Sequence, residues 1–545
     1  MSAATFDYLI VGAGTAGCVL AGRLAEDAGT TVCVLEAGGD ERSFKVAVPA
    51  LVAAAIGTPR LNWGFETVPQ PALQGRRVPQ PRGRVVGGSG SINGMAYHRG
   101  HPRDYDDWAR AGAEGWDYAH VLPYFTRSEH NEDFPDSPFH GQGGPINVRR
   151  PRPENRLNHA FIASVRAAGF PAAADLTGPA PEGVGLRQGL LRGGRRESTA
   201  RAYLRPALRT GRVDLRTGAR VLRLLLEGRR VTGVEVEIAG QRQQLHARRE
   251  VLLCAGAVQS PQVLLLSGIG PAEELRAAGV TPVVDVPGVG ANLHDHLSCP
   301  VVMATDDATS YGLSARALPR GALHLLQYLL TRTGPLAGNV FESVAFLRTC
   351  AGLDRPDVQF VFQPAARPKP GFPLPVGHGF VINPVNLYPR SRGKLMLAGP
   401  DPHAAPLIDP ALLHDPADLQ PMLRALRLAR RFLAGEPFAR YRAHETLPGV
   451  AAQDDAALTD YIRSMAFTVH HQVGTCRMGN DAAAVVDPEL RFRGLDGLRV
   501  VDASVMPNIV GGNTNAVVVM IAERAADLIR GRRLLAPAQA ALQAT

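Results

Sequence analysis

A glycine-rich turn near the N-terminus has the spacing of a dinucleotide-binding loop. Gly12, Gly14 and Gly17 form the pattern G-x-G-x-x-G. In such a loop the first glycine permits a tight turn, the second lets the backbone approach a pyrophosphate, and the third lets a helix pack closely on a strand. The free N–H groups at the start of that helix attract the phosphates. Because a glycine-rich turn can also occur without any ligand, the pattern alone is weak evidence.

The elements around this turn strengthen the interpretation. An apolar run over residues 6–11 predicts a buried strand before the turn, and residues 16–26 predict a helix after it. A second apolar run, 31–35, ends at Glu36, whose carboxylate can accept hydrogen bonds from both hydroxyls of a ribose. The order strand, turn, helix, strand and acid predicts a dinucleotide site, without deciding between FAD and NAD.

Two further segments are typical of a chain that lies against a large ligand. Residues 81–97 interleave glycines with apolar side chains, which makes a poor helix or strand but suits a loop packed on a flat ligand. Residues 251–253 predict a strand. A helix is expected to open at Ser260, with proline tolerated at its first position, and to end near Gly268.

These two segments resemble both signature motifs of the glucose–methanol–choline (GMC) oxidoreductases. Further blocks resemble family-typical stretches in the same order, so that the likeness extends from residue 6 to about residue 530; they are 287–296, 471–479, 501–504 and 512–515. The resemblance implies FAD, the oxidation of an alcohol, and an α/β fold. In that fold a Rossmann-like FAD-binding domain is joined to a substrate domain that has an antiparallel sheet and flanking helices.

The resemblance also assigns residues to the cofactor. Some relatives attach the flavin covalently through a histidine in the glycine-rich loop, and the matching residue here is Ile92, which implies non-covalent FAD. The predicted FAD contacts are Gly12, Gly14, Thr15, Ala16, Gly17, Glu36, Ala37, Trp63, Arg82, Val86, Asn93, Gly94, Met95, Ala96, Val221, Ala255, Asp502, Ala503 and Asn515.

His471 and Asn513 stand where the family has its catalytic pair. A histidine that is neutral near pH 7 can take the hydroxyl proton of an alcohol, while the hydride passes to flavin N5. An amide can hold the substrate oxygen but cannot serve as a second base. The alternatives are a structural histidine at 471 and a helix N-cap at Asn513, a cap that Asn515 could also provide.

The sequence says less about the substrate. Glu342 resembles a glutamate that choline-oxidising relatives hold against the trimethylammonium group, and His470 precedes the expected base. Relatives that act on aliphatic alcohols also have a glutamate nearby, so a primary alcohol is the prediction and choline the alternative. The electron acceptor is expected to be a quinone or another carrier, as in a dehydrogenase, with O2 and an oxidase as the alternative. A non-redox flavoenzyme on the same fold, a lyase or a photodecarboxylase, is a further alternative.

The order of the motifs predicts discontinuous domains. The FAD-binding domain is expected to comprise residues 1–155, 196–300 and 464–535, the substrate domain residues 156–195 and 301–463, and the tail residues 536–545. Within the substrate domain, strands are expected near 358–362 and 394–397 and helices near 323–330 and 418–433. A loop rich in proline and glycine, 364–378, could cover the entrance to the site.

Composition and charge narrow the partners. The excess of 59 lysines and arginines over 50 acidic residues gives a formal net charge of +9, but the arginines are scattered, so we expect no nucleic-acid partner and at most peripheral membrane contact. The six cysteines form no C-x-x-C pair, and the adjacent His470 and His471 lack ligand spacing, so no metal site is expected. With no signal peptide recognised, a cytoplasmic location is predicted, or one on the surface of the inner membrane. No oligomeric state is predicted.

Overall fold

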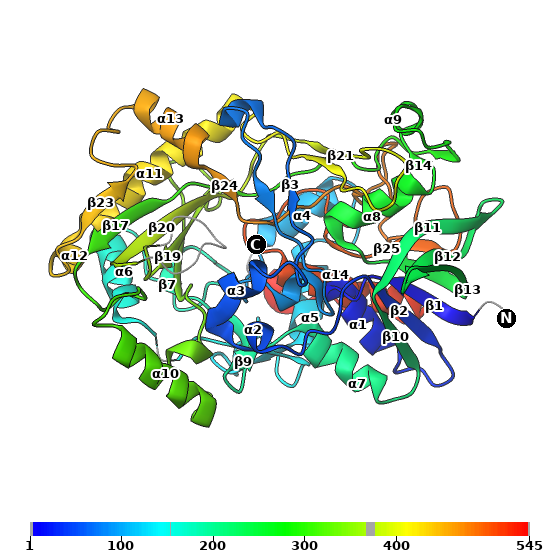
Figure 1. Cartoon of the computed structure of the whole chain (residues 1–545), viewed down its shortest axis with the longest axis horizontal. Helices are drawn as coiled ribbons and strands as arrows, with labels where there is room; N and C mark the ends of the chain where they lie inside the picture. The colour runs from blue at the N-terminus through cyan, green and yellow to red at the C-terminus, as the bar shows by residue number, and fades with distance from the viewer. Residues whose placement is uncertain (1–3, 153, 367–375, 543–545) are drawn as a thin grey trace.

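The computed structural model of this chain describes residues 4–152, 154–366 and 376–542. It has two large sheets, one on the right and one on the left of the molecule in Figure 1. The first is mixed with a parallel core and the second is antiparallel, so the predicted α/β class is confirmed. The loop that was predicted to cover the site, 364–378, lies mostly outside the described residues.

Seven strands form the first sheet, in the order β10-β2-β1-β13-β12-β11, with β25 sharing one edge of the long strand β13. The parallel strands are β1 (Thr5–Val11), β2 (Val32–Glu36), β10 (Val213–Thr217), β13 (Gln241–Leu253) and β25 (Leu498–Val500), and β11 (Ala219–Glu227) and β12 (Arg230–Ile238) extend the sheet in antiparallel fashion. Val11 pairs with Leu35. The carboxyl ends of β1 and β2 therefore lie side by side and bring the glycine turn next to Glu36.

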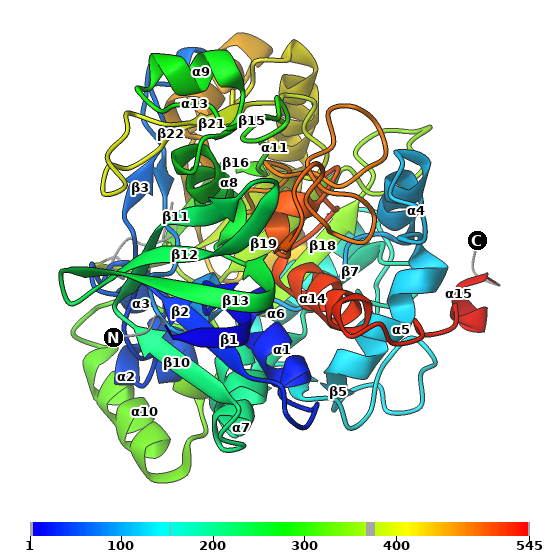
Figure 2. The same ribbon diagram turned by 90° about the vertical axis from the view of Figure 1, so that its right-hand side faces the viewer.

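Two helices begin at that same edge. α1 (Thr15–Leu24) and α14 (Asn515–Ile529) pack against each other, as Figure 2 shows. The Thr15 hydroxyl donates to the side-chain carbonyl of Asn515 at 2.8 Å, which joins the two N-termini. Deeper in the protein, the buried carboxylate of Glu523 on α14 pairs with Arg23 of α1 and with Arg127 of α5 (Tyr118–Ser128). A buried carboxylate that is paired in this way keeps the helices in one register.

Within the described ranges, eight strands form the second sheet, and every pairing between them is antiparallel. They are β7 (Gly183–Leu186), β16 (Leu297–Ser298), β17 (Val301–Thr305), β18 (Ser343–Leu347), β19 (Val358–Gln363), β20 (His378–Asn386), β23 (His444–Leu447) and β24 (Phe467–Thr468). The predicted boundaries place β16 and β24 in the FAD-binding domain, but both strands hydrogen-bond within this sheet.

One face of the second sheet is covered and the other faces the site. Val358, Phe360 and Phe362 of β19 point into a core that also contains residues of α6 (Arg156–Ala167) and α11 (Leu419–Leu433). Side chains alternate along a strand, so the residues between them face the opposite way, toward the first sheet.

Most predicted elements of the substrate domain are present. β19 and α11 match their predictions, β21 (Lys394–Met396) is one residue shorter, and α10 (Leu318–Thr331) extends beyond residues 323–330 at both ends. In the tail, α15 (Gln539–Leu542) lies against α5. Within the described residues, none of the helices combines the length and the apolar character needed to cross a membrane.

The helix that was predicted to open at Ser260 begins earlier. α8 spans Gly256–Leu266, so Pro261 lies inside it. A proline in this position leaves the carbonyl of Ala257 without its helical donor. The hydroxyl of Thr475 donates to that carbonyl at 2.7 Å and replaces the missing bond. The prediction was wrong because the compensating donor is distant in sequence.

Candidate active site

A cavity separates the turn after β1 from the open face of the second sheet. All but three of the predicted FAD contacts line it; those that do are Gly12, Gly14, Thr15, Ala16, Glu36, Ala37, Trp63, Arg82, Asn93, Gly94, Ala96, Val221, Ala255, Asp502, Ala503 and Asn515. Gly17, Val86 and Met95 are not among the lining residues. The predicted catalytic residues His471 and Asn513 line the same cavity, as does His470. Residues from the two ends of the chain therefore meet in one site.

The glycine turn has the features that a pyrophosphate requires. Gly12 has φ +100°, and a Cβ atom there would lie 2.7 Å from the carbonyl oxygen of Cys254. A Cβ atom on Gly17 would lie 2.0 Å from the carbonyl oxygen of Gly12, so Gly17 permits helix and strand to pack, as predicted. Gly14 is the N-cap of α1, and no side chain of its own caps the helix. The first N–H groups of α1 are thus available to phosphate oxygens.

Glu36 is held in place by the backbone. Its two carboxylate oxygens accept hydrogen bonds from the N–H of Gly38 at 2.8 Å and of Ala13 at 3.1 Å. Burial raises the pKa of this carboxyl to about 7. Each oxygen has a second lone pair, which suits the hydroxyls of a ribose.

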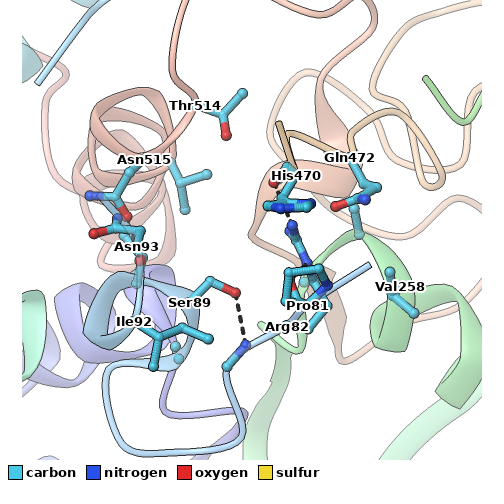
Figure 3. Close-up of a pocket in the computed structure, with 18 of the residues that line it drawn as sticks. Pro81, Arg82, Ser89, Ile92, Asn93, Val258, His470, Gln472, Thr514 and Asn515 are labelled. Carbon is cyan, nitrogen blue, oxygen red and sulfur yellow. Dashed lines mark hydrogen bonds between the residues drawn. The ribbon is translucent and has the colours of Figure 1, made fainter. Parts of the chain in front are cut away.

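The glycine-rich loop lies directly on this turn. A Cβ atom on Gly88 would lie 2.8 Å from the Cα of Gly14, and the Ser89 hydroxyl accepts from the N–H of Gly83 at 3.1 Å. In Figure 3, Ser89, Ile92 and Asn93 lie on one side of the pocket, and Arg82, His470 and Gln472 lie on the other. The loop is predicted to pack on a flat ligand, and this pocket has residues on two sides that fit the ring system of FAD.

Asp502 lines the cavity beside the start of α8 and is held there by several hydrogen bonds. Its carboxylate accepts from the N–H of Gly256 at 2.9 Å, from the Ser260 hydroxyl at 2.5 Å and from both the N–H and the hydroxyl of Ser504. The N–H of Gly256 belongs to the first turn of α8, so Asp502 also stabilises the early start of that helix.

His471 and Asn513 contact each other. The side-chain nitrogen of Asn513 lies 3.0 Å from Nε2 of His471, and the backbone N–H of His471 donates to Asp295 at 2.6 Å. Burial, followed by the neighbouring His296, His470, Arg82 and His98, holds the pKa of His471 well below its usual range. His471 is therefore a neutral imidazole at pH 7.

The hydrogen bonds around His471 fix which of its nitrogens carries the proton. Nε2 of His296 lies 3.0 Å from the carbonyl oxygen of Leu387, which can only accept, so that nitrogen bears the hydrogen. Burial lowers the pKa of His296 to about 4, so its Nδ1 has a free lone pair. Nδ1 of His471 lies 2.9 Å away and must be the donor. The lone pair of His471 is consequently on Nε2, beside Asn513 and in the cavity.

Asn513 does not cap α14. The helix follows Thr514, whose side chain makes no capping bond, and Asn515 is already its first helical residue. Both cap interpretations, for Asn513 and for Asn515, are therefore wrong: Asn515 joins α14 to Thr15 instead. The side-chain oxygen of Asn513 is buried and has no hydrogen-bond partner among the described residues.

His470 and Glu342, the two predicted substrate contacts, are placed differently. His470 lines the cavity with φ +67°, Arg82 donates to its carbonyl oxygen, and burial lowers the pKa of its ring to about 3. Glu342 is buried but is not among the lining residues. Its carboxylate accepts from the N–H of Asn155 at 2.7 Å, from the Tyr311 hydroxyl at 3.2 Å and from Asn158. Its neighbour Phe341 lines the cavity in its place.

Several residues of the site were not identified from the sequence. The open face of the second sheet contributes Arg187, Gln359, Gln363 and Asn383 to the cavity, and His296 orients His471. The alternation of polar and apolar residues in the predicted strand 358–362 contained a signal for Gln359. No local pattern identifies Arg187, which immediately follows β7 and reaches the site only because β7 pairs with β18.

Family models and known relatives both cover most of this chain. Two models described as GMC oxidoreductase match residues 6–298 and 389–522. An alcohol dehydrogenase [acceptor] of Pseudomonas putida is 41% identical over 96% of this chain and 95% of its own, and an oxygen-dependent choline dehydrogenase of Rhizobium etli is 40% identical over 97% and 96%.

Two solved structures show the same fold. Pyridoxine 4-oxidase from Mesorbium loti superposes with a TM-score of 0.88 at 33% identity over 97% of this chain and 100% of its own. A formate oxidase superposes with a TM-score of 0.90 at 26% identity over 97% and 99%. This chain therefore belongs to the GMC oxidoreductases, a family of FAD-binding enzymes, which confirms the predicted family and cofactor.

Proposed function

We propose that this protein oxidises a primary alcohol to the aldehyde, with His471 as the base and Asn513 as the group that holds the substrate oxygen. One observation carries the proposal: a neutral imidazole presents its lone pair on Nε2 in the cavity, 3.0 Å from an amide nitrogen. A substrate hydroxyl that replaces the hydrogen bond between these two groups could donate its proton to Nε2 and accept a hydrogen bond from the amide.

When bound, FAD supplies the acceptor for the hydride that leaves the carbinol carbon. His471 accepts the hydroxyl proton at Nε2, and the carbon–oxygen double bond of the aldehyde forms. Asn513 stabilises the negative charge that develops on the oxygen. A base of this kind typically contributes about 10²–10⁴-fold in rate.

His296 supports this step as a positioning residue. Nδ1 of His296 accepts a hydrogen bond from Nδ1–H of His471. This bond keeps the lone pair of His471 on Nε2 and fixes the orientation of its ring. When His471 takes up a proton, the same hydrogen bond stabilises the imidazolium, because its Nδ1–H becomes a stronger donor.

We further propose that FAD is held without a covalent bond. Ile92, whose position some relatives fill with the attaching histidine, lines the cavity with a hydrocarbon side chain that can form no such bond. Phosphate contacts at the start of α1 and ribose contacts to Glu36 would hold the cofactor in place of a covalent link.

The names of the relatives support an alcohol as the substrate. They are compatible with two kinds of electron acceptor. The name of the Pseudomonas putida protein specifies an alcohol and an unspecified acceptor, while that of the Rhizobium etli protein specifies choline and oxygen. We propose a dehydrogenase that passes its electrons to a quinone or a similar carrier, with O2 as the alternative acceptor.

An anaerobic titration tests the function. The purified flavoprotein is mixed with a series of primary alcohols without oxygen, and the loss of flavin absorbance is followed. We expect rapid bleaching that becomes about 10²–10⁴-fold slower in His471→Ala, while the FAD content is unchanged. Trichloroacetic acid should release all the FAD into solution. A flavin that no alcohol bleaches would contradict the proposal and favour a non-redox flavoenzyme, and equal rates in His471→Ala would contradict the assignment of the base.

Peroxide assays after air is readmitted separate the acceptors. A dehydrogenase should turn over with a soluble quinone and form little peroxide, whereas an oxidase should form one peroxide for each alcohol oxidised.

A further inference from the structure

The wall of the cavity formed by the second sheet is polar in a way that the proposed chemistry does not use. Arg187, Gln359, Gln363 and Asn383 all line the cavity, and each is at least nine-tenths buried. Each of them has a buried polar side-chain atom without a hydrogen-bond partner among the described residues. Buried polar groups in folded proteins are nearly always paired, so a cluster of unpaired ones lining a cavity points to a ligand.

The strand register explains why these groups gather. Gln359 and Gln363 lie four residues apart on β19, with Val361 between them on the same face. Val361 pairs with Asn383 on the neighbouring strand β20. The pairing of β7 with β18 then brings Arg187 to the same wall, where its guanidinium lies over the ring of Phe341 at 5.6 Å from the ring centroid.

Arg187 is the charged member of this group, and its burial is the most costly. Arg187 is only 4% exposed. No carboxylate among the described residues forms an ion pair with it. Glu342 is the nearby acid, but its carboxylate is already bonded to Asn155, Asn158 and Tyr311. An isolated buried cation is costly, and burial accordingly lowers the pKa of Arg187 to about 9.

The unpaired atoms of Arg187 have the geometry of an anion site. They are Nε and Nη2, the two nitrogens on one edge of the guanidinium. That edge presents two parallel N–H groups, which match the two oxygens of a carboxylate. The side-chain amides of Gln359 and Gln363 add uncharged donors on the same wall.

We propose that Arg187, with the side-chain amides of Gln359 and Gln363, forms a subsite for a carboxylate, and that the preferred substrates are alcohols that carry a carboxylate at the far end from the hydroxyl. The unpaired atom of Asn383 on the same wall is its side-chain oxygen, which can only accept a hydrogen bond and is therefore not a partner of the carboxylate. This inference rests on the proposed function, because it places the hydroxyl at His471 and the carboxylate at Arg187. It also predicts that choline is a poor substrate, because its quaternary ammonium would meet a buried guanidinium rather than a free glutamate.

A comparison of matched substrates tests the proposal. The holoenzyme is reduced anaerobically with 3-hydroxypropanoate, 4-hydroxybutanoate and 6-hydroxyhexanoate, each beside the 1-alkanol of the same carbon number and beside choline. We expect at least one hydroxy acid to exceed its alkanol in the second-order rate of flavin reduction by about 100-fold, the effect of a charge-assisted bidentate pair. No preference at any chain length would overturn the proposal, while bleaching by the alkanols would leave the proposed function standing.

Variants then connect the preference to Arg187. Arg187→Met should abolish the preference, so that a hydroxy acid and its matched alkanol reduce the flavin of the variant at rates within about threefold of each other, because the carboxylate has lost its partner. Arg187→Lys retains the charge without the paired donors and should retain part of the preference. Arg209→Met, which removes an exposed arginine, is the matched control and should behave as wild type. An unchanged preference in Arg187→Met would overturn the assignment.

A binding measurement covers the outcome in which no alcohol reduces the flavin or in which Arg187→Met does not retain FAD. Hexanoate has no hydroxyl to oxidise, so its binding to the oxidised wild-type holoenzyme can be followed as a change in the flavin absorption spectrum. We expect a saturable change with hexanoate and none with hexanamide at the same concentration. The absence of any change with hexanoate would count against the subsite whatever the fate of the proposed function.

Discussion

The two sides of the cavity satisfy their polar groups in opposite ways. On the cofactor side, the chain itself supplies partners: Glu36 accepts from two backbone N–H groups, and Asp502 accepts from Gly256, Ser260 and Ser504. On the substrate side, Arg187 and the amides of the second sheet have side-chain atoms with no hydrogen-bond partner in the part of the chain that the structure describes. The cofactor side is thus ordered by its own backbone, whereas the substrate side is completed by what binds there.

The two sides also differ in how the sequence encodes them. The cofactor side consists of contiguous motifs in which a turn and the helix after it fix the positions of neighbouring residues. The substrate side consists of single residues from β7, β19 and β20, and these come together only through long-range strand pairing. Substitutions on the two sides should therefore have different consequences, and we expect the largest effect where the backbone of the cofactor side is packed most tightly.

Gly17→Ala should nearly abolish FAD binding. A Cβ atom at this position would lie 2.0 Å from the carbonyl oxygen of Gly12, which is backbone and cannot move without distorting the phosphate turn. We expect the purified variant to contain almost no FAD, as measured by the ratio of flavin to protein absorbance. Gly39→Ala is the control, because a Cβ atom there meets nothing within 4 Å, and it should retain full flavin content. Normal FAD content in Gly17→Ala would show that the turn tolerates displacement.

How far the sequence could predict the structure follows from the same difference. The strand, turn, helix and acid of residues 6–36 were predicted in the right order, and most of the predicted FAD contacts line the cavity, because each depends on residues close by in the chain. The start of α8 was misplaced because Thr475, more than 200 residues away, satisfies the carbonyl that Pro261 leaves free. The alternative of an N-cap at Asn513 is wrong because α14 begins after Thr514 without a side-chain cap.

The substrate contacts show where prediction from the sequence stops. Glu342 was a reasonable candidate by resemblance, but the polar groups of Asn155 and Tyr311 draw its carboxylate away from the cavity. Arg187 and His296 could not be identified, because their importance depends on partners from other strands or on the absence of partners. A sequence pattern predicts which residues face one side of a strand, and it does not say which of them lack a hydrogen bond.

His296→Phe should slow flavin reduction without lowering the FAD content of the protein. The change removes the acceptor for Nδ1–H of His471, so the tautomer with its lone pair on Nε2 is no longer favoured. We expect flavin reduction by an alcohol to slow by about 10–100-fold at unchanged FAD content, the usual range for a residue that orients a functional histidine. His296→Asn offers a carbonyl oxygen as an acceptor and should recover part of the rate.

The pH dependence distinguishes orientation from a general structural effect. Because the folded protein holds the pKa of His471 well below 6.5, the base is already neutral at pH 6, and the wild-type rate of flavin reduction should be flat between about pH 6 and pH 8. The rate should fall only in more acidic solution, where His471 takes up a proton. A rate that rises tenfold between pH 6 and pH 7 would contradict the neutral state of His471, and equal rates in His296→Phe and His296→Asn would reduce His296 to a packing residue.

Thr475→Val should have the smallest effect. It changes the contact between the segment that follows His471 and helix α8. Thr475 follows the catalytic segment by a few residues and donates its hydroxyl to the carbonyl of Ala257 inside α8. Valine has nearly the same shape but no donor, so the carbonyl is left buried and unpaired at a cost of about 1–3 kcal/mol. We expect the thermal unfolding midpoint of the holoenzyme to fall by a few degrees, with flavin content and reduction rate close to wild type. Thr475→Ser keeps the hydroxyl and should restore most of the midpoint; if it unfolds no later than Thr475→Val, the methyl group of Thr475 rather than its hydrogen bond stabilises α8.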